Sequence, residues 1–110
     1  MPGGPPFVKL PLFSIPVIEG DKVTRQVAIW IVLELTEGQS AATLEPKERQ
    51  LIDAFLRDLY GMFAQRSGAN RIAIQASIKE RLARTADSVL GPGIVKQVLI
   101  QQLYEQERPH

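Results

Sequence analysis

The stretch "VTRQVAIWIVLEL", from Val23 to Leu35, decides the fold because it carries the clearest strand pattern in the chain. Its odd-numbered positions are apolar except for Arg25, and such a period of two is typical of a strand with one buried face. The even-numbered positions are apolar only in the middle, around Trp30. We therefore predict a central strand, and an element or a partner that covers Trp30. A core position is the favoured interpretation for Trp30, and an interface position is the alternative.

The residues before this strand predict a weaker strand that pairs with it as a hairpin. Phe7 to Phe13 is rich in apolar residues, but Pro11 cannot donate to a sheet ladder, so a strand here lies at an edge or is broken midway. Gly20-Asp21 is a turn signal that leads into the central strand. Residues 1–6 are mostly proline and glycine and are assigned to a linker or to the start of the chain.

A first amphipathic helix is predicted to start near Pro46, because the first turn of a helix accepts proline. Thr43 and Glu45 are plausible capping or dipole-compensating groups for it. Its apolar positions between Leu51 and Phe63 fall within one arc of the helix surface. Gly61 is expected to weaken this helix, which should end by Gly68.

A second helix and a final strand complete the predicted domain. Apolar residues from Ile74 to Val89 recur at spacings of four and three, and Gly91 suits a left-handed cap. Ile94 to Leu103 is rich in valine, isoleucine and leucine and indicates a strand. The expected fold is a small α/β domain of the α+β type, in the order β-β-α-α-β, with a sheet packed against two amphipathic helices. The domain spans residues 7–104, and residues 105–110 form a frayed tail.

Composition narrows the classes of function. With 110 residues, of which 45% are hydrophobic, the chain suits one compact domain. Its 13 basic and 12 acidic residues are interspersed and leave a net charge of +1, so no broad field attracts nucleic acid or an anionic membrane. The chain also lacks an apolar run long enough to cross a bilayer as a helix, so we expect a membrane link only through a segment absent from it.

No catalytic, cofactor-binding or metal-binding residues are predicted. The chain has no cysteine, and its one histidine is the terminal His110. The loop Gly91-Pro92-Gly93 runs from a helix into a strand, which is the wrong direction for a phosphate site, since phosphates bind at helix N-termini. We therefore expect a protein that is not an enzyme.

Aromatic and arginine side chains supply the candidates for a protein interface. Trp30, Tyr60 and Tyr104 are considered first because aromatic anchors carry large contact energies. Arg66 and Arg71 bracket a loop and are candidates to pair with carboxylates of another subunit.

Four blocks of sequence, taken in order, cover nearly the whole of the chain between Phe7 and Gln101. The blocks are "FVKLPLFSIPVI", "VAIWIVLEL", "LIDAFLRDLYG" and "IKERLARTADSVLGPGIVKQVLIQ". Together they resemble the periplasmic domain of the FliL family of flagellar basal-body-associated proteins. The chain departs from the family at its end, where "VLIQQLY" replaces an aromatic-rich strand.

The resemblance implies a stomatin-like (SPFH-like) fold and a non-enzymatic scaffold without cofactors. Such a domain would form homo-oligomers, apparently rings, contact the stator units of the flagellar motor, and support motility or its regulation. It would lie on the periplasmic face of the inner membrane if a membrane helix precedes it, and in the cytoplasm otherwise. The alternative is a small soluble ligand-binding or regulatory α/β domain unrelated to the flagellum, which a deep polar pocket holding Arg25 or Glu34 would favour.

Overall fold

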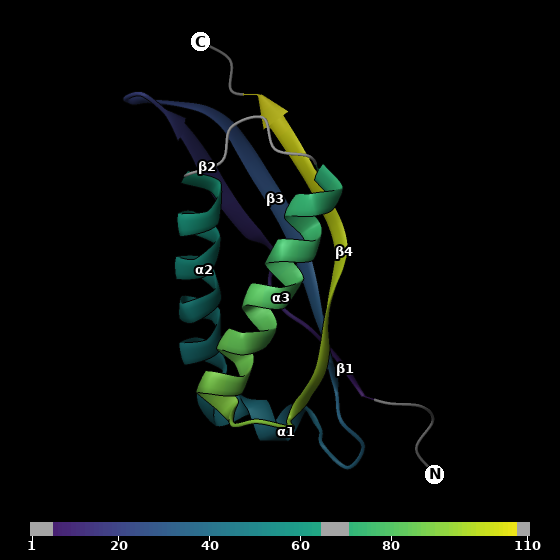
Figure 1. Ribbon diagram of the computed structural model, residues 1–110. Helices are drawn as coiled ribbons and strands as arrows, with labels where there is room; N and C mark the ends of the chain where they lie inside the picture. Colours follow the sequence, from purple (N-terminus) through teal and green to yellow (C-terminus); the bar gives the residue numbers. More distant parts are fainter. Residues whose placement is uncertain (1–5, 65–70, 108–110) are drawn as a thin grey trace.

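The computed structural model describes residues 6–64 and 71–107 and shows a sheet with two long helices on one of its faces (Figure 1). The molecule is elongated, with principal extents of 52 × 23 × 22 Å. In chain order the elements are β1 (Phe7–Lys9), β2 (Phe13–Glu19), β3 (Lys22–Leu35), α1 (Ala41–Leu44), a 3₁₀ turn η1 (Glu45–Lys47), α2 (Glu48–Ala64), α3 (Arg71–Leu90) and β4 (Val95–Glu107).

The predicted central strand is the middle of a four-stranded antiparallel sheet. β3 pairs with β1 and β2 on one side and with β4 on the other. The expected α+β class is therefore confirmed, with the order β-β-β-α-α-β in place of β-β-α-α-β. The additional strand arises because the Phe7 to Phe13 segment is broken around Pro11, as its sequence predicted.

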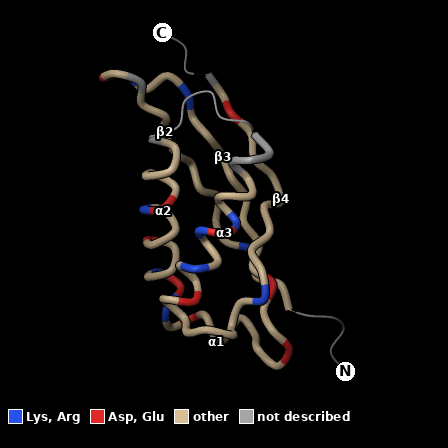
Figure 2. The backbone as a smooth tube through the Cα atoms, in the orientation of Figure 1, with Lys and Arg blue, Asp and Glu red and all other residues tan. Residues whose placement is uncertain are grey.

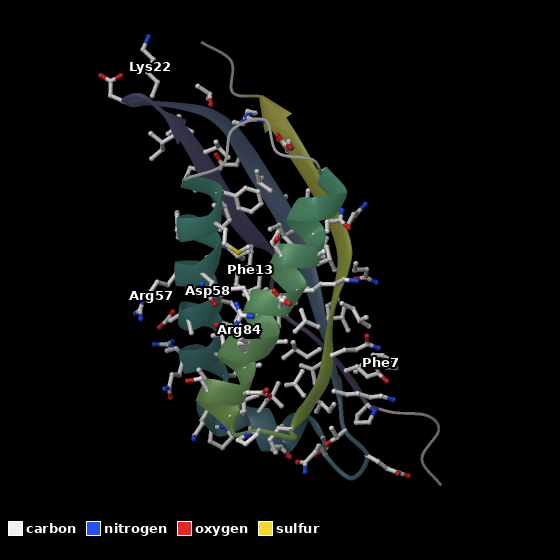
Figure 3. All side chains as sticks on the ribbon, in the orientation of Figure 1. Phe7, Phe13, Lys22, Arg57, Asp58 and Arg84 are labelled. Atoms are coloured by element: carbon white, nitrogen blue, oxygen red, sulfur yellow. The ribbon has the colours of Figure 1, made fainter. Side chains whose placement is uncertain are left out.

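The odd-numbered side chains of β3 form the centre of the core. The residues from Val27 to Leu35 at these positions are each at most 1% exposed, and α2 and α3 supply the other side of the cluster. Phe13 of β2 and Phe55 of α2 meet there, with ring centroids 6.3 Å apart; Figure 3 shows Phe13 in the space between α2 and the sheet. The strand is thus buried on the face that its period of two predicted.

The helical region begins earlier than the sequence predicted. α1 starts at Ala41, and the backbone N–H of Ser40 donates to Thr43 Oγ1 at 3.5 Å. Pro46 lies in the 3₁₀ turn between α1 and α2, where its missing N–H removes no helical hydrogen bond that the first turn needs. The predicted start near Pro46 is therefore corrected to a short helix, a turn and a long helix.

Two glycines were expected to affect the helices, Gly61 by weakening the first long helix and Gly91 by ending the second. Gly61 lies within α2, which continues to Ala64, so the expected weakening does not end the helix there. Gly91 follows the last residue of α3 and has a φ of 101°, which confirms the predicted left-handed cap. Its N–H donates to the carbonyl oxygen of Asp87 at 2.9 Å.

Because the two glycines differ in φ, alanine is expected to change stability in opposite directions at the two positions. Gly91→Ala places a Cβ on a positive φ and should destabilise by about 1 kcal/mol. Gly61→Ala meets no atom within 4 Å and should stabilise by about 0.5–1 kcal/mol. Urea denaturation of both variants, followed by circular dichroism, measures the difference. Changes of the same sign would contradict the assigned backbone conformations.

β4 is longer than the sequence predicted. It extends to Glu107, so residues 105–107, which were assigned to a frayed tail, continue the strand. The extension has a partner because β3 begins as early as Lys22, and Arg25 Nη1 lies 2.8 Å from Glu105 Oε1. Pro6, which was assigned to the linker, accepts a hydrogen bond from the N–H of Leu35 at 2.9 Å. The rest of the linker and residues 108–110 lie outside the described residues.

Candidate protein-interaction surface

We call the face of the sheet that points away from α2 and α3 the open face. Most of its central side chains are apolar or aromatic. Within residues 6–64 and 71–107, both long helices pack on the opposite face, and Figure 1 shows them side by side there. The open face follows from the strand registers, because side chains alternate between the two faces of a sheet. Its members are Phe7, Lys9, Ala28, Trp30, Val32, Leu99, Gln102 and Tyr104.

Trp30 lies at the centre of the open face and is only partly buried. The Nζ atom of Lys9, on the neighbouring strand, lies 4.4 Å from the centroid of the indole ring, within the range of a cation–π contact. Trp30 does not belong to the cluster of buried core residues, so the favoured core interpretation is wrong. No helix of the described residues lies over Trp30, so the covering element of the prediction is absent there, and the Lys9 side chain lies against the ring instead.

Tyr104 extends the aromatic surface onto β4. It pairs with Ala28, whereas Trp30 pairs with Gln102, so the two aromatic residues are diagonal neighbours on one face. Tyr104 is 44% exposed. Of the five predicted interface residues, the structure brings these two together.

The middle of the sheet carries little charge. β3 has no charged residue between Arg25 and Glu34, and β4 has none between Lys96 and Glu105. In Figure 2 the charged residues of these two strands accordingly lie toward the strand ends. Lys9 is the charged residue among the members of the open face. A surface with little charge that keeps two aromatic rings near solvent is the type of surface that binds other proteins.

Glu34 is a buried acid at one end of the open face, and sequence reasoning missed its burial. Its residue is 6% exposed, and its carboxylate accepts a hydrogen bond of 2.5 Å from Gln97 Nε2. Lys96 Nζ lies 3.7 Å from its other oxygen. Phe7 is its partner on β1. These contacts satisfy the carboxylate, so Glu34 fastens β4 to β3 and is not a free acid at a reactive site.

The helix layer carries different chemistry from the open face. Asp58 of α2 forms an ion pair with Arg81 Nε at 3.1 Å and accepts a hydrogen bond from the hydroxyl of Thr85, which joins α2 to α3. In Figure 3 Asp58 points toward α3, whereas Arg57 points away from it. Basic and acidic residues are interspersed along both helices (Figure 2). Such a mixture of charges is typical of a solvated helix surface.

Tyr60 and the two arginines are not part of the open face. Tyr60 belongs to α2 and is 47% exposed, so it lies in the helix layer, on the other side of the sheet from Trp30. Arg66 lies outside the described residues. Arg71 is the first residue of α3, and its side chain also lies outside the described part of the structure. The predicted roles of Arg66 and Arg71 therefore stay predictions.

A groove of about 760 Å³ runs between α2 and α3. Its lining residues include Arg49, Asp53, Arg57 and Asp58, and it does not include Arg25 or Glu34. Arg25 instead pairs with Glu105 at the end of the sheet. This groove is therefore not the pocket around Arg25 or Glu34 that would favour a ligand-binding domain.

Comparison with models of known protein families finds no match, and comparison with curated proteins finds none either. Among the described residues, no helix has both the length and the apolar character that a membrane crossing requires. The resemblance to the FliL family therefore rests on the sequence blocks alone.

Proposed function

We propose that this chain is a non-enzymatic assembly domain of the flagellar basal body, which self-associates and contacts the motor stator. In this role it acts at the periplasmic face of the inner membrane and supports motility or its regulation. The observation that carries the proposal is the open face, because this aromatic surface centred on Trp30 has no helix of the described chain over it. Surfaces of this kind are typical of interaction sites.

Two further observations support the proposal, one for assembly over catalysis and one for the flagellum. Two acidic groups on different elements, Glu34 and Asp58, are each bound to neighbours within the domain. A carboxylate held in this way stabilises the fold and is poorly placed to exchange protons with a substrate. The order of the sequence blocks supplies the flagellar part of the proposal, since the same order occurs in the FliL family.

Light scattering and a binding assay test the two halves of this proposal. The apparent mass of the purified chain should rise from 12.2 kDa as its concentration increases. The chain should also bind the immobilised periplasmic segment of the stator subunit from the same organism. A constant monomer mass at every concentration, also when the chain is tethered to a membrane helix, would contradict the proposed self-association. Absence of binding to the stator segment would remove the second half.

A further inference from the structure

The outer edge of β4 is open along its length, and it differs in this respect from the opposite edge of the sheet. β4 has 13 residues and pairs only with β3 in the described part of the chain. Figure 1 shows it along one side of the sheet with no strand beyond it. A strand in this position presents a row of unpaired N–H and C=O groups, which is a template for another strand.

The opposite edge carries features that discourage such pairing. β1 has only three residues, and Pro16 within β2 lacks an N–H. β4 contains neither proline nor glycine, and its only basic residue is Lys96. Natural sheets protect their edges with short strands, proline and lysine. The sheet is thus protected on one side and available on the other.

The sequence of β4 is complementary to itself when two copies run antiparallel. Lys96 lies at one end of the strand and Glu107 at the other, so the antiparallel pair described next places Lys96 of one copy opposite Glu107 of the other, whereas a parallel pair in register places each residue opposite its own copy. If the two-fold axis passes between Gln101 and Gln102, Leu99 of one copy lies opposite Tyr104 of the other. Ile100 of one copy then lies opposite Leu103 of the other.

This register also preserves both faces of the sheet. Leu99 and Tyr104 belong to the open face, whereas Ile100 and Leu103 pack against the core on the helix side. Residues directly opposite each other in an antiparallel pair point to the same face, so the register leaves no apolar residue on the wrong side. The register of β4 against β3 shifts at two residues, Gln101 and Lys96. The shifts at Gln101 of the two copies would meet at the axis, and those at Lys96 lie beyond the central paired residues.

We infer that a second copy of this chain pairs with the outer edge of β4, antiparallel, with Leu99 opposite Tyr104 of that copy. The inference rests on the proposed self-association and names the surface that performs it. The pair has two-fold symmetry, and its two four-stranded sheets form one continuous sheet. About ten backbone hydrogen bonds would join the copies between residues 97 and 106. The two open faces then lie side by side as one larger surface for a partner.

Disulfide trapping tests this register, because the chain has no cysteine of its own. Leu99→Cys and Tyr104→Cys chains are prepared separately, mixed and oxidised. Opposite residues in an antiparallel pair have Cα atoms about 4.5–5.5 Å apart, within the range of a disulfide. The mixture should give a covalent dimer, and neither variant should do so alone. A mixture of Gln97→Cys with Gln106→Cys tests the same register at two exposed positions.

The matched control is a mixture of Leu99→Cys with Gln102→Cys, which places the cysteines two residues out of register on the same face. Its covalent dimer should be at least about tenfold less abundant, because the cysteines are too far apart for unstrained bonding. Equal or greater trapping in the control would overturn the inference. A chain that self-associates in light scattering without register-specific trapping would overturn the β4 pairing and leave the proposed function standing. A strict monomer would remove both.

Discussion

Replacing Phe55 by alanine is expected to lower the free energy of unfolding by about 3–5 kcal/mol, the range for buried aromatic residues. Phe55 is fully buried, and its ring packs against Phe13 where α2 meets the sheet. The loss would be a large share of the roughly 5–15 kcal/mol that stabilises a typical domain. Urea denaturation followed by circular dichroism measures it.

Two controls make this prediction specific to burial. Phe7→Ala removes the same ring from a site that is 56% exposed, and should change stability by at most about 0.5 kcal/mol. Phe55→Leu retains part of the buried volume and should lose less than Phe55→Ala, so it remains measurable if the alanine variant does not fold. A loss below about 1 kcal/mol for Phe55→Ala would mean that the helices do not pack on the sheet as described.

Replacing Trp30 by threonine is expected to weaken binding to the stator segment by about 30-fold, since a central aromatic anchor contributes about 2 kcal/mol or more. Threonine favours strands and so preserves the backbone of β3. It removes the indole ring and its contact with Lys9 from the centre of the open face. Surface plasmon resonance with the immobilised stator segment measures the affinity.

Tyr60→Ala is the matched control for this variant. It removes an aromatic side chain that is more exposed than Trp30 from the helix layer and should leave the affinity unchanged. Because Trp30 does not lie on the edge of the sheet, Trp30→Thr should also leave the register-specific trapping between β4 strands unchanged. If Tyr60→Ala weakens binding and Trp30→Thr does not, the partner binds the helix layer and the open face has another role.

The sequence predicted most clearly those elements whose pattern is local. The period of two in β3 identified the buried face, because alternation within a single strand depends on no other part of the chain. The left-handed cap at Gly91 was predictable for the same reason, since the residue after a helix determines it. The start of the helical region was harder, because α1 and η1 together are only seven residues long, too short for a periodic pattern.

Features that depend on distant residues were missed. Glu34 is buried because Gln97 and Lys96 reach it from β4, more than 60 residues later in the chain. The extension of β4 to Glu107 likewise depends on the early start of β3. The exposure of Trp30 depends on whether an element also covers the second face of β3, and the apolar residues in the middle of that face leave this open. The sequence thus predicted which residues of β3 share the open face, and it did not predict that this face has no helix over it.

The central position of β3 in the sheet affects how the protein folds during its synthesis on the ribosome. β3 is made early, but the strand that completes its second edge is the last element of the described chain. Sheets that depend on such distant pairing fold slowly, because a long loop must close before its contacts form. The unpaired side of β3 therefore remains exposed until β4 has been synthesised, and chains that terminate before Val95 should be substrates for chaperones and proteases.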